Sequence, residues 1–180
     1  MFHKDATPTL FLAVLLCAGC GEGPAPKANA ASVAAKPKAA AQGPKIDPCS
    51  LVTGEEIEAV VGWKVMKATP SSYGSTAVCN FSGPQEFTQM LSLVVAPGMP
   101  QVASSAEMAA WRKKQTESYG DIKFVIAPVE GLGVPAIRNE VEGTGLATIE
   151  AAAKGMLLDV TSSTLEQAKA LAAKAITRLP

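Results

Sequence analysis

Histidine, the side chain that enzymes most often use for proton transfer near neutral pH, occurs only once in this chain. Its single histidine, His3, lies at the extreme N-terminus, so the rest of the chain has no imidazole for proton transfer or metal binding. A Ser-His-Asp or Cys-His arrangement is therefore excluded in the remainder of the chain. The Gly131-Leu132-Gly133 segment lacks the further glycine and the lysine of a phosphate-binding loop.

Carboxylates are the groups left for acid–base chemistry. Four of them fall on predicted strands, namely Glu140, Glu142, Glu150 and Asp159. Two that met across a sheet would suit a glycosidase-type pair or an oxygen-liganded Ca²⁺ site. The alternative, which we favour, is that all four are solvent-facing residues of the sheet.

The N-terminal segment indicates where the protein resides. Residues 10–16 form a short apolar run, and Ala18 and Gly19 precede Cys20. The run is too short for a membrane-spanning helix, which needs about 20 residues, but it is typical of an export signal. The pattern resembles a bacterial lipoprotein signal, which implies removal of residues 1–19 and acylation of Cys20. An ordinary signal cut elsewhere and an uncleaved anchor are the alternatives.

The cysteine count leaves one pair for the body of the protein. With Cys17 and Cys20 assigned to the signal and the anchor, Cys49 and Cys79 remain. A lone pair in an exported domain is most simply a disulfide. Its loop of about 30 residues corresponds to roughly 3.5 kcal/mol in the chain-entropy description. A redox-active pair is the alternative, although the two cysteines lack Cys-x-x-Cys spacing.

Composition divides the chain after the anchor. Residues 21–45 are almost entirely Ala, Gly, Pro and Lys, with too few large apolar side chains to offset the entropy of ordering. We therefore expect the anchor and a disordered linker over residues 20–46, and one globular domain over residues 47–180. The domain has 11 basic and 14 acidic side chains. This net charge of −3 argues against a nucleic-acid partner.

Three predicted helices begin with a capping-box pattern, in which a hydroxyl residue is followed three positions later by Glu or Gln. The pairs are Thr53 with Glu56, Ser104 with Glu107, and Thr164 with Gln167. The helices are expected to end near residues 61, 119 and 179. Acidic residues cluster in the first turns of the first helix, where the helix dipole stabilises them: Glu55, Glu56 and Glu58.

Alternating apolar residues between the helices predict strands. Residues 63–69 and 76–82 are expected to flank a loop that exposes Tyr73, a candidate partner contact or a solvated aromatic with no role. Further strands are expected over residues 89–96, 122–127, 135–141, 146–152 and 156–162. Consecutive hairpins imply an α+β fold, an antiparallel sheet of about six to seven strands with three helices gathered on one face. The order α-βββ-α-βββ(β)-α is consistent with a duplication of two halves.

The start of the predicted domain resembles a known family. The motif Asp-Pro-Cys-x-Leu-x-Thr at residues 47–53, a helix ending in Gly62, and Cys79-Asn80-Phe81 are similar to a family of small bacterial lipoproteins of unknown function, common in actinobacteria. Residues 129–133 and the alanine-rich last helix are similar to its second half. The resemblance implies a Cys49–Cys79 disulfide and an exported, lipid-anchored context. It implies no reaction.

These observations predict a lipid-anchored binding or interaction module of the cell envelope without catalytic activity. We expect no cofactor and no metal, and two partners: the membrane, through acylated Cys20, and an unidentified envelope ligand or protein. A carboxylate-based envelope hydrolase and a structural subunit of an envelope complex are the alternatives. The expected location is the periplasmic face of the outer membrane, or the outer face of the cell membrane where there is no outer membrane.

Overall fold

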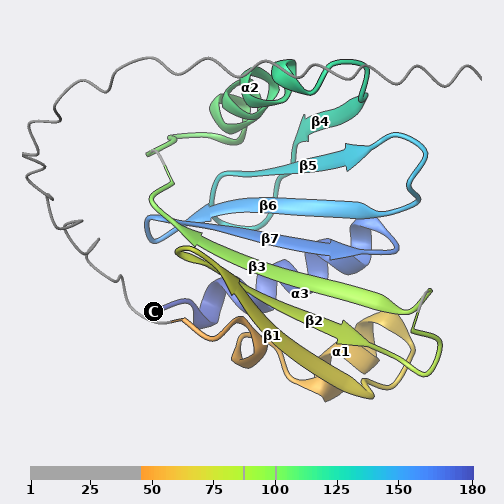
Figure 1. Cartoon of the computed structure of the whole chain (residues 1–180). Helices are drawn as coiled ribbons and strands as arrows, with labels where there is room; N and C mark the ends of the chain where they lie inside the picture. Colours follow the sequence, from red (N-terminus) through yellow and green to blue (C-terminus); the bar gives the residue numbers. More distant parts are fainter. Residues whose placement is uncertain (1–45, 87, 100) are drawn as a thin grey trace, which may run out of the picture. The chain divides into compact units, whose positions relative to one another are not determined.

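A computed structural model describes residues 46–86, 88–99 and 101–180 of the chain (Figure 1). The elements are η1 (Pro48–Ser50), α1 (Gly54–Val61), β1 (Lys67–Tyr73), β2 (Thr76–Ser82), β3 (Met90–Pro97), α2 (Ser105–Thr116), η2 (Glu117–Tyr119), β4 (Phe124–Pro128), β5 (Ala136–Val141), β6 (Ala147–Ala153), β7 (Met156–Ser162) and α3 (Leu165–Arg178). The predicted α+β class and element order are confirmed, with four strands in the second half.

The strands form one antiparallel sheet in the order β1-β2-β3-β7-β6-β5-β4. This order is symmetric about β7, because β3 and β6 flank it, followed outward by β2 and β5 and then by β1 and β4. Two halves related by an axis along β7 would have this order, so the predicted duplication is compatible with the topology and stays a prediction.

The helices lie on both faces of the sheet, so the expectation that they gather on one face is wrong. Helix α3 packs on β6 and β7 and contacts α1, while α2 packs on β4 and β5. On β7, Leu158 belongs to the core under α3, whereas the next side chain along, Leu157, packs against the cluster under α2. Because successive side chains of a strand point to opposite faces, the two helices cover opposite faces.

All three predicted helix starts are confirmed. Thr53 and Glu56 form a complete capping box, in which each side chain accepts from the backbone of the other. Ser104 and Thr164 cap α2 and α3 by accepting from the backbone three residues on. Helix α2 ends at Thr116, and a 3-10 turn continues the chain to Tyr119.

The first strand is shifted along the chain relative to the prediction. The segment expected to be a loop, Pro70 to Tyr73, lies within β1, and the turn follows at Gly74, whose φ is 62°. Every residue of β1 is exposed, so no apolar alternation marks this strand in the sequence. Pro70 is tolerated because β1 is an edge strand of the sheet.

The predicted disulfide between Cys49 and Cys79 is present. It joins η1 to β2, where Cys79 is completely buried beside Phe81 and Leu93 in the core under α1 and α3. The segment at which the described chain begins is thereby fixed to the interior of the sheet.

Candidate functional site

Among the residues that the structure describes, no helix covers one face of the sheet across β1, β2 and β3 and part of β7. In β2 and β3 buried side chains alternate with partly exposed ones, and the buried set faces α1 and α3. The other set forms what we call the open face, and its members are Lys67, Thr69, Ser71, Tyr73, Thr76, Val78, Asn80, Ser82, Met90, Ser92, Val94, Ala96, Leu157, Asp159 and Thr161. In Figure 1 the open face is turned toward the viewer, with α1 and α3 behind the sheet.

Polar side chains of the open face lie in register across the strands. Thr69 pairs with Asn80, Asn80 with Ser92, and Ser92 with Thr161, which in turn pairs with Thr148 of β6. We call this set the polar row. The hydroxyls of Thr148 and Thr161 are 2.9 Å apart and hydrogen-bonded. Neighbouring strands are about 4.8 Å apart, so the row is a line of roughly 19 Å.

A parallel row of the same face is partly apolar. It consists of Ser71, Val78, Val94 and Asp159, paired in that order from β1 to β7. Both valines are partly exposed. The open face therefore offers hydroxyl and amide groups next to a short aliphatic strip.

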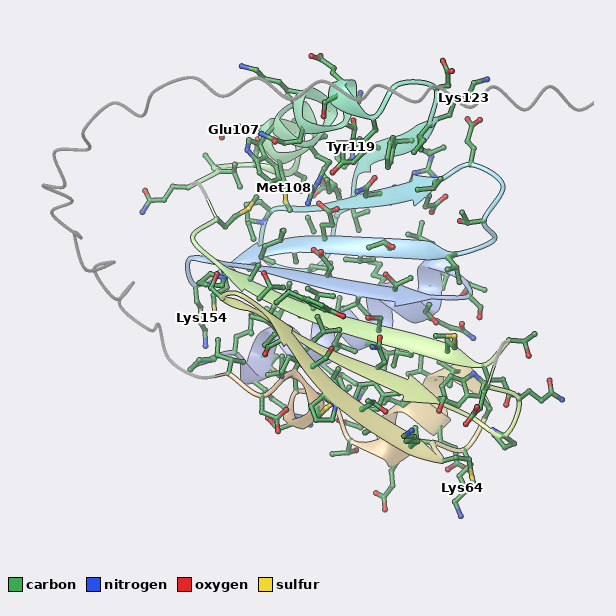
Figure 2. The ribbon with its side chains drawn as sticks, viewed as in Figure 1. Lys64, Glu107, Met108, Tyr119, Lys123 and Lys154 are labelled. Atoms are coloured by element: carbon green, nitrogen blue, oxygen red, sulfur yellow. A yellow bond between two sulfur atoms is a disulfide. The ribbon has the colours of Figure 1, made fainter. Side chains whose placement is uncertain are left out.

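Helix α2 closes the same face at its far end. Its buried residues Met108 and Ala109 pack on Ile126 of β4 and Ile137 of β5. Figure 2 shows Met108 on the side of α2 that faces the sheet. Helix α2 covers β4 and β5, and Ala152 of β6 and Leu157 of β7 pack against the edge of this cluster. None of the described helices covers β1, β2 and β3 on this face.

A partly buried ion pair marks the border between α2 and the open face. The Nε and Nη2 atoms of Arg112 each lie 2.6 Å from Oε2 of Glu150, and Asn139 donates to its Oε1 at 2.6 Å. Glu150 is 3% exposed. Both of its oxygens are thus engaged, and the pair holds α2 against β6. Separating such partners leaves a buried charge uncompensated.

Asp159 lies directly opposite Glu150 on the neighbouring strand β7. Its Oδ1 atom is buried without a hydrogen-bond partner among the described residues, as is Oδ1 of Asn139. Burial and the neighbouring Glu150 carboxylate raise the pKa of Asp159 to about 7, and Arg112 partly offsets this rise. Asp159 therefore holds its proton to a higher pH than an ordinary aspartate does.

The expectation that the four strand carboxylates face solvent holds only in part. It is confirmed for Glu142, which is exposed, and it is wrong for Glu150, because α2 covers the sheet at that position. Asp159 is partly buried. The structure brings Glu150 and Asp159 together, whereas Glu140 and Glu142 lie at the other end of β5.

Two shallow hollows lie outside the Glu150–Asp159 pair. The first, of about 450 Å³, is between the loop after β3, the start of α2 and the β6–β7 turn, and it is lined by Met99, Val102 and Glu107 among others. The second, of about 410 Å³, is between the β5–β6 loop and the start of α3, and both Glu140 and Glu142 line it.

Two kinds of feature are missing from the described part of the chain. Residues 46–86, 88–99 and 101–180 hold no cluster of three or more His, Cys, Asp or Glu side chains suited to a metal ion. Within the same ranges, none of the helices has the length and apolar character needed to cross a membrane.

The remaining predicted sites have mixed outcomes. Tyr73 is 75% exposed, as predicted, but it lies at the end of β1 on the open face instead of in a loop. The expected signal peptide (residues 1–19), the acylation site Cys20 and the linker lie outside the described residues. Sequence reasoning missed Arg112 and Asn139, because nothing in their spacing relates them to Glu150.

Comparisons with known proteins give a distant structural likeness. No protein-family model matches the chain, and no curated protein matches it. The extracellular domain of PknH from Mycobacterium tuberculosis is 14% identical, with a TM-score of 0.43, over 76% of this chain and 97% of that domain. A GTP-binding regulator from Thermotoga maritima is 12% identical, with a TM-score of 0.33, over 72% of this chain and 91% of that protein. Both scores are low, and we base no functional argument on them.

Proposed function

We propose that this protein is a lipid-anchored binding or interaction module of the cell envelope, without catalytic activity, and that it binds its ligand on the open face. The observation that carries the proposal is the composition of that face. An ordinary solvated sheet surface is rich in long charged side chains. Here Lys67 at one corner and Asp159 beside α2 are the only basic and acidic residues on the face.

The arrangement of charges supports a binding role over catalysis. The carboxylate of Glu150 accepts from Arg112 and Asn139 on its two oxygens, so it is committed to holding α2 in place. Its neighbour Asp159 has a buried oxygen, and neither of the two hollows is lined by this pair. A glycosidase-type pair needs two carboxyl groups that both reach the substrate.

A carboxylate hydrolase is the second candidate, and it rests on Glu140 and Glu142 lining the same hollow. It predicts that Glu140→Gln and Glu142→Gln each abolish hydrolysis of a polysaccharide of the cell's own wall, measured as release of reducing ends. Equal release by both variants and the unaltered protein, or no release by any of them, removes this candidate.

The extracytoplasmic setting is supported by the Cys49–Cys79 disulfide, because such bonds persist in oxidising compartments. The anchor on Cys20 and the family resemblance are part of this proposal. Metabolic labelling with a palmitate analogue tests the anchor. We expect the label and the membrane association to be lost in Cys20→Ala and retained in Cys17→Ala.

Site-specific photocrosslinking in the native envelope tests the binding surface. A photoreactive p-benzoylphenylalanine replaces Val78, which is partly exposed at the centre of the open face. The matched control places it at Ala173, an exposed position of α3 on the other side of the sheet. Crosslinked products from position 78 and not from position 173 support the proposal. Products from position 173 alone, or from neither position, contradict it.

A further inference from the structure

Building on the proposed function, we infer that the ligand of the open face is a neutral, hydroxyl-rich chain, an oligosaccharide segment, which lies across β2, β3 and β7. This inference names the chemical class of the ligand. It follows from the chemistry, spacing and charge of the two parallel rows of side chains.

The polar row matches the hydrogen-bonding character of a sugar. Hydroxyl and carboxamide groups both donate and accept, as sugar hydroxyls do. Asn80 and Ser92 lie at the centre of the row, are partly exposed, and make no side-chain hydrogen bond with any other described residue. Their donors and acceptors are therefore satisfied by solvent, which a ligand can replace.

The adjacent row supplies the complementary apolar contact. Val78 and Val94 pair with one another, one register step from Asn80 and Ser92. A pyranose ring has hydroxyls at its rim and C–H groups on its faces, so it can contact both rows at once. Tyr73 lies on the same face one step further along, where an exposed ring can stack on a sugar.

Charge selects against other ligand classes. Nucleic acids and anionic lipids require clustered lysines or arginines, and Lys67 is the only such residue on the open face. An apolar peptide helix requires an apolar groove, whereas the apolar residues of this face, chiefly Val78, Val94 and Met90, are interspersed with small polar side chains. A neutral polar ligand is the class that remains.

The twist of the sheet sets the length of the contact. Neighbouring strands rotate by about 20 to 25° relative to one another, so a stiff chain follows the face over three or four strands only. The binding segment is therefore short, a few sugar units centred on Asn80 and Ser92.

The test measures binding of the full-length protein to two defined probes by isothermal calorimetry. One is a hexamer of β-1,4-linked N-acetylglucosamine, and the other is the corresponding glucose hexamer. We expect binding of at least one hexamer, and the comparison reports whether the acetamido groups contribute. Failure of both probes to bind at millimolar concentration overturns the inference.

Matched variants locate the binding on the open face. We expect Tyr73→Ala to weaken binding about three- to tenfold, and Tyr119→Ala, which alters the other exposed tyrosine, to leave it unchanged. Likewise Thr161→Val is expected to weaken binding, and Thr177→Val on α3 is not. Thermal unfolding of each variant verifies that it is folded. Equal binding by face variants and controls overturns the inference.

The two proposals fail in distinguishable ways. Crosslinks from position 78 to a protein, together with no binding of either hexamer, would retain the binding surface and refute the oligosaccharide. Absence of any crosslink from position 78 would refute the surface itself.

Discussion

At the scale of single residues, Asp159 is the most unusual group of the structure. Its carboxyl is partly buried opposite Glu150, and its pKa is raised to about 7 from an ordinary value of 3.8. The folded state therefore holds this proton more tightly than the unfolded state does. The resulting stabilisation is lost as the pH rises from about 4 to 7, and it is absent above that range.

Asp159→Asn removes this pH dependence. We expect the free energy of unfolding of the variant, relative to the unaltered protein, to increase by about 2.5 to 3 kcal/mol between pH 5 and pH 8, since about two pH units lie between pH 5 and the folded-state pKa and each unit corresponds to about 1.4 kcal/mol. Urea denaturation at a series of pH values measures it. The exposed Asp121→Asn variant is the control. Parallel stability profiles for Asp159→Asn and the unaltered protein would contradict the prediction.

At the scale of elements, one side chain ties α1 to α3. Glu56 accepts from Nη1 and Nη2 of Arg178 at 2.5 and 2.8 Å, and Nζ of Lys174 is 3.5 Å away. It also caps α1 through the backbone of Thr53. The hydrogen bonds from Arg178 and Thr53 lower the pKa of Glu56 to about 2. The stabilisation is therefore present above pH 4.5 and is lost as the pH falls toward 2.

Glu56→Gln should lower the urea midpoint at pH 6, and the difference from the unaltered protein should shrink as the pH approaches 2. Glu55→Gln is the matched control, because its side chain is exposed in the same helix turn. A constant difference across this range, or an equal loss in the control, would show that the Arg178 contact is not the cause.

Elements that are set by neighbouring residues could be predicted from the sequence, and elements that depend on distant contacts could not. The capping pairs lie within four residues, so all three helix starts were predictable. Strand β1 was misplaced because an exposed edge strand needs no apolar alternation, and Pro70 resembles a loop residue. The prediction that α2 lies on the same face as α1 and α3 was wrong. Leu157 and Leu158 point to opposite faces of β7 and are both apolar, so the sequence does not show which helix covers which face.

The candidate site was less predictable for the same reason. The pairing of Asn80 with Ser92 and of Ser92 with Thr161 depends on the register of three strands, two of which are far apart in the sequence. The ion pair of Arg112 with Glu150 joins residues 38 positions apart. No local pattern encodes such contacts, whereas exposure of Tyr73 followed from its polar surroundings.

At the scale of the whole molecule, the disulfide fixes the start of the described chain to the sheet. Cys49 and Cys79 are 30 residues apart and join η1 to the buried side of β2. The cross-link restricts the unfolded chain around β2, the strand that pairs with both β1 and β3.

Replacing both cysteines by alanine is expected to reduce the free energy of unfolding by about 3 to 4 kcal/mol, because the unfolded loop regains its entropy. Urea denaturation of the double variant measures the loss, and the unaltered protein under reducing conditions is the comparison. We expect the two to agree closely. A loss below about 1 kcal/mol in both would contradict the predicted role of the disulfide.

The position of β7 has a consequence for how the chain is made. This strand joins β3 to β6, and of the seven strands of the described sheet it is the last to be synthesised. Until it emerges, β3 and β6 each present a bare hydrogen-bonding edge, which invites pairing with other chains. A nascent chain arrested at Gly155 would hold two half-sheets and no continuous one. Folding of the sheet therefore waits for β7, and truncation before Met156 is expected to give aggregates instead of a smaller folded domain.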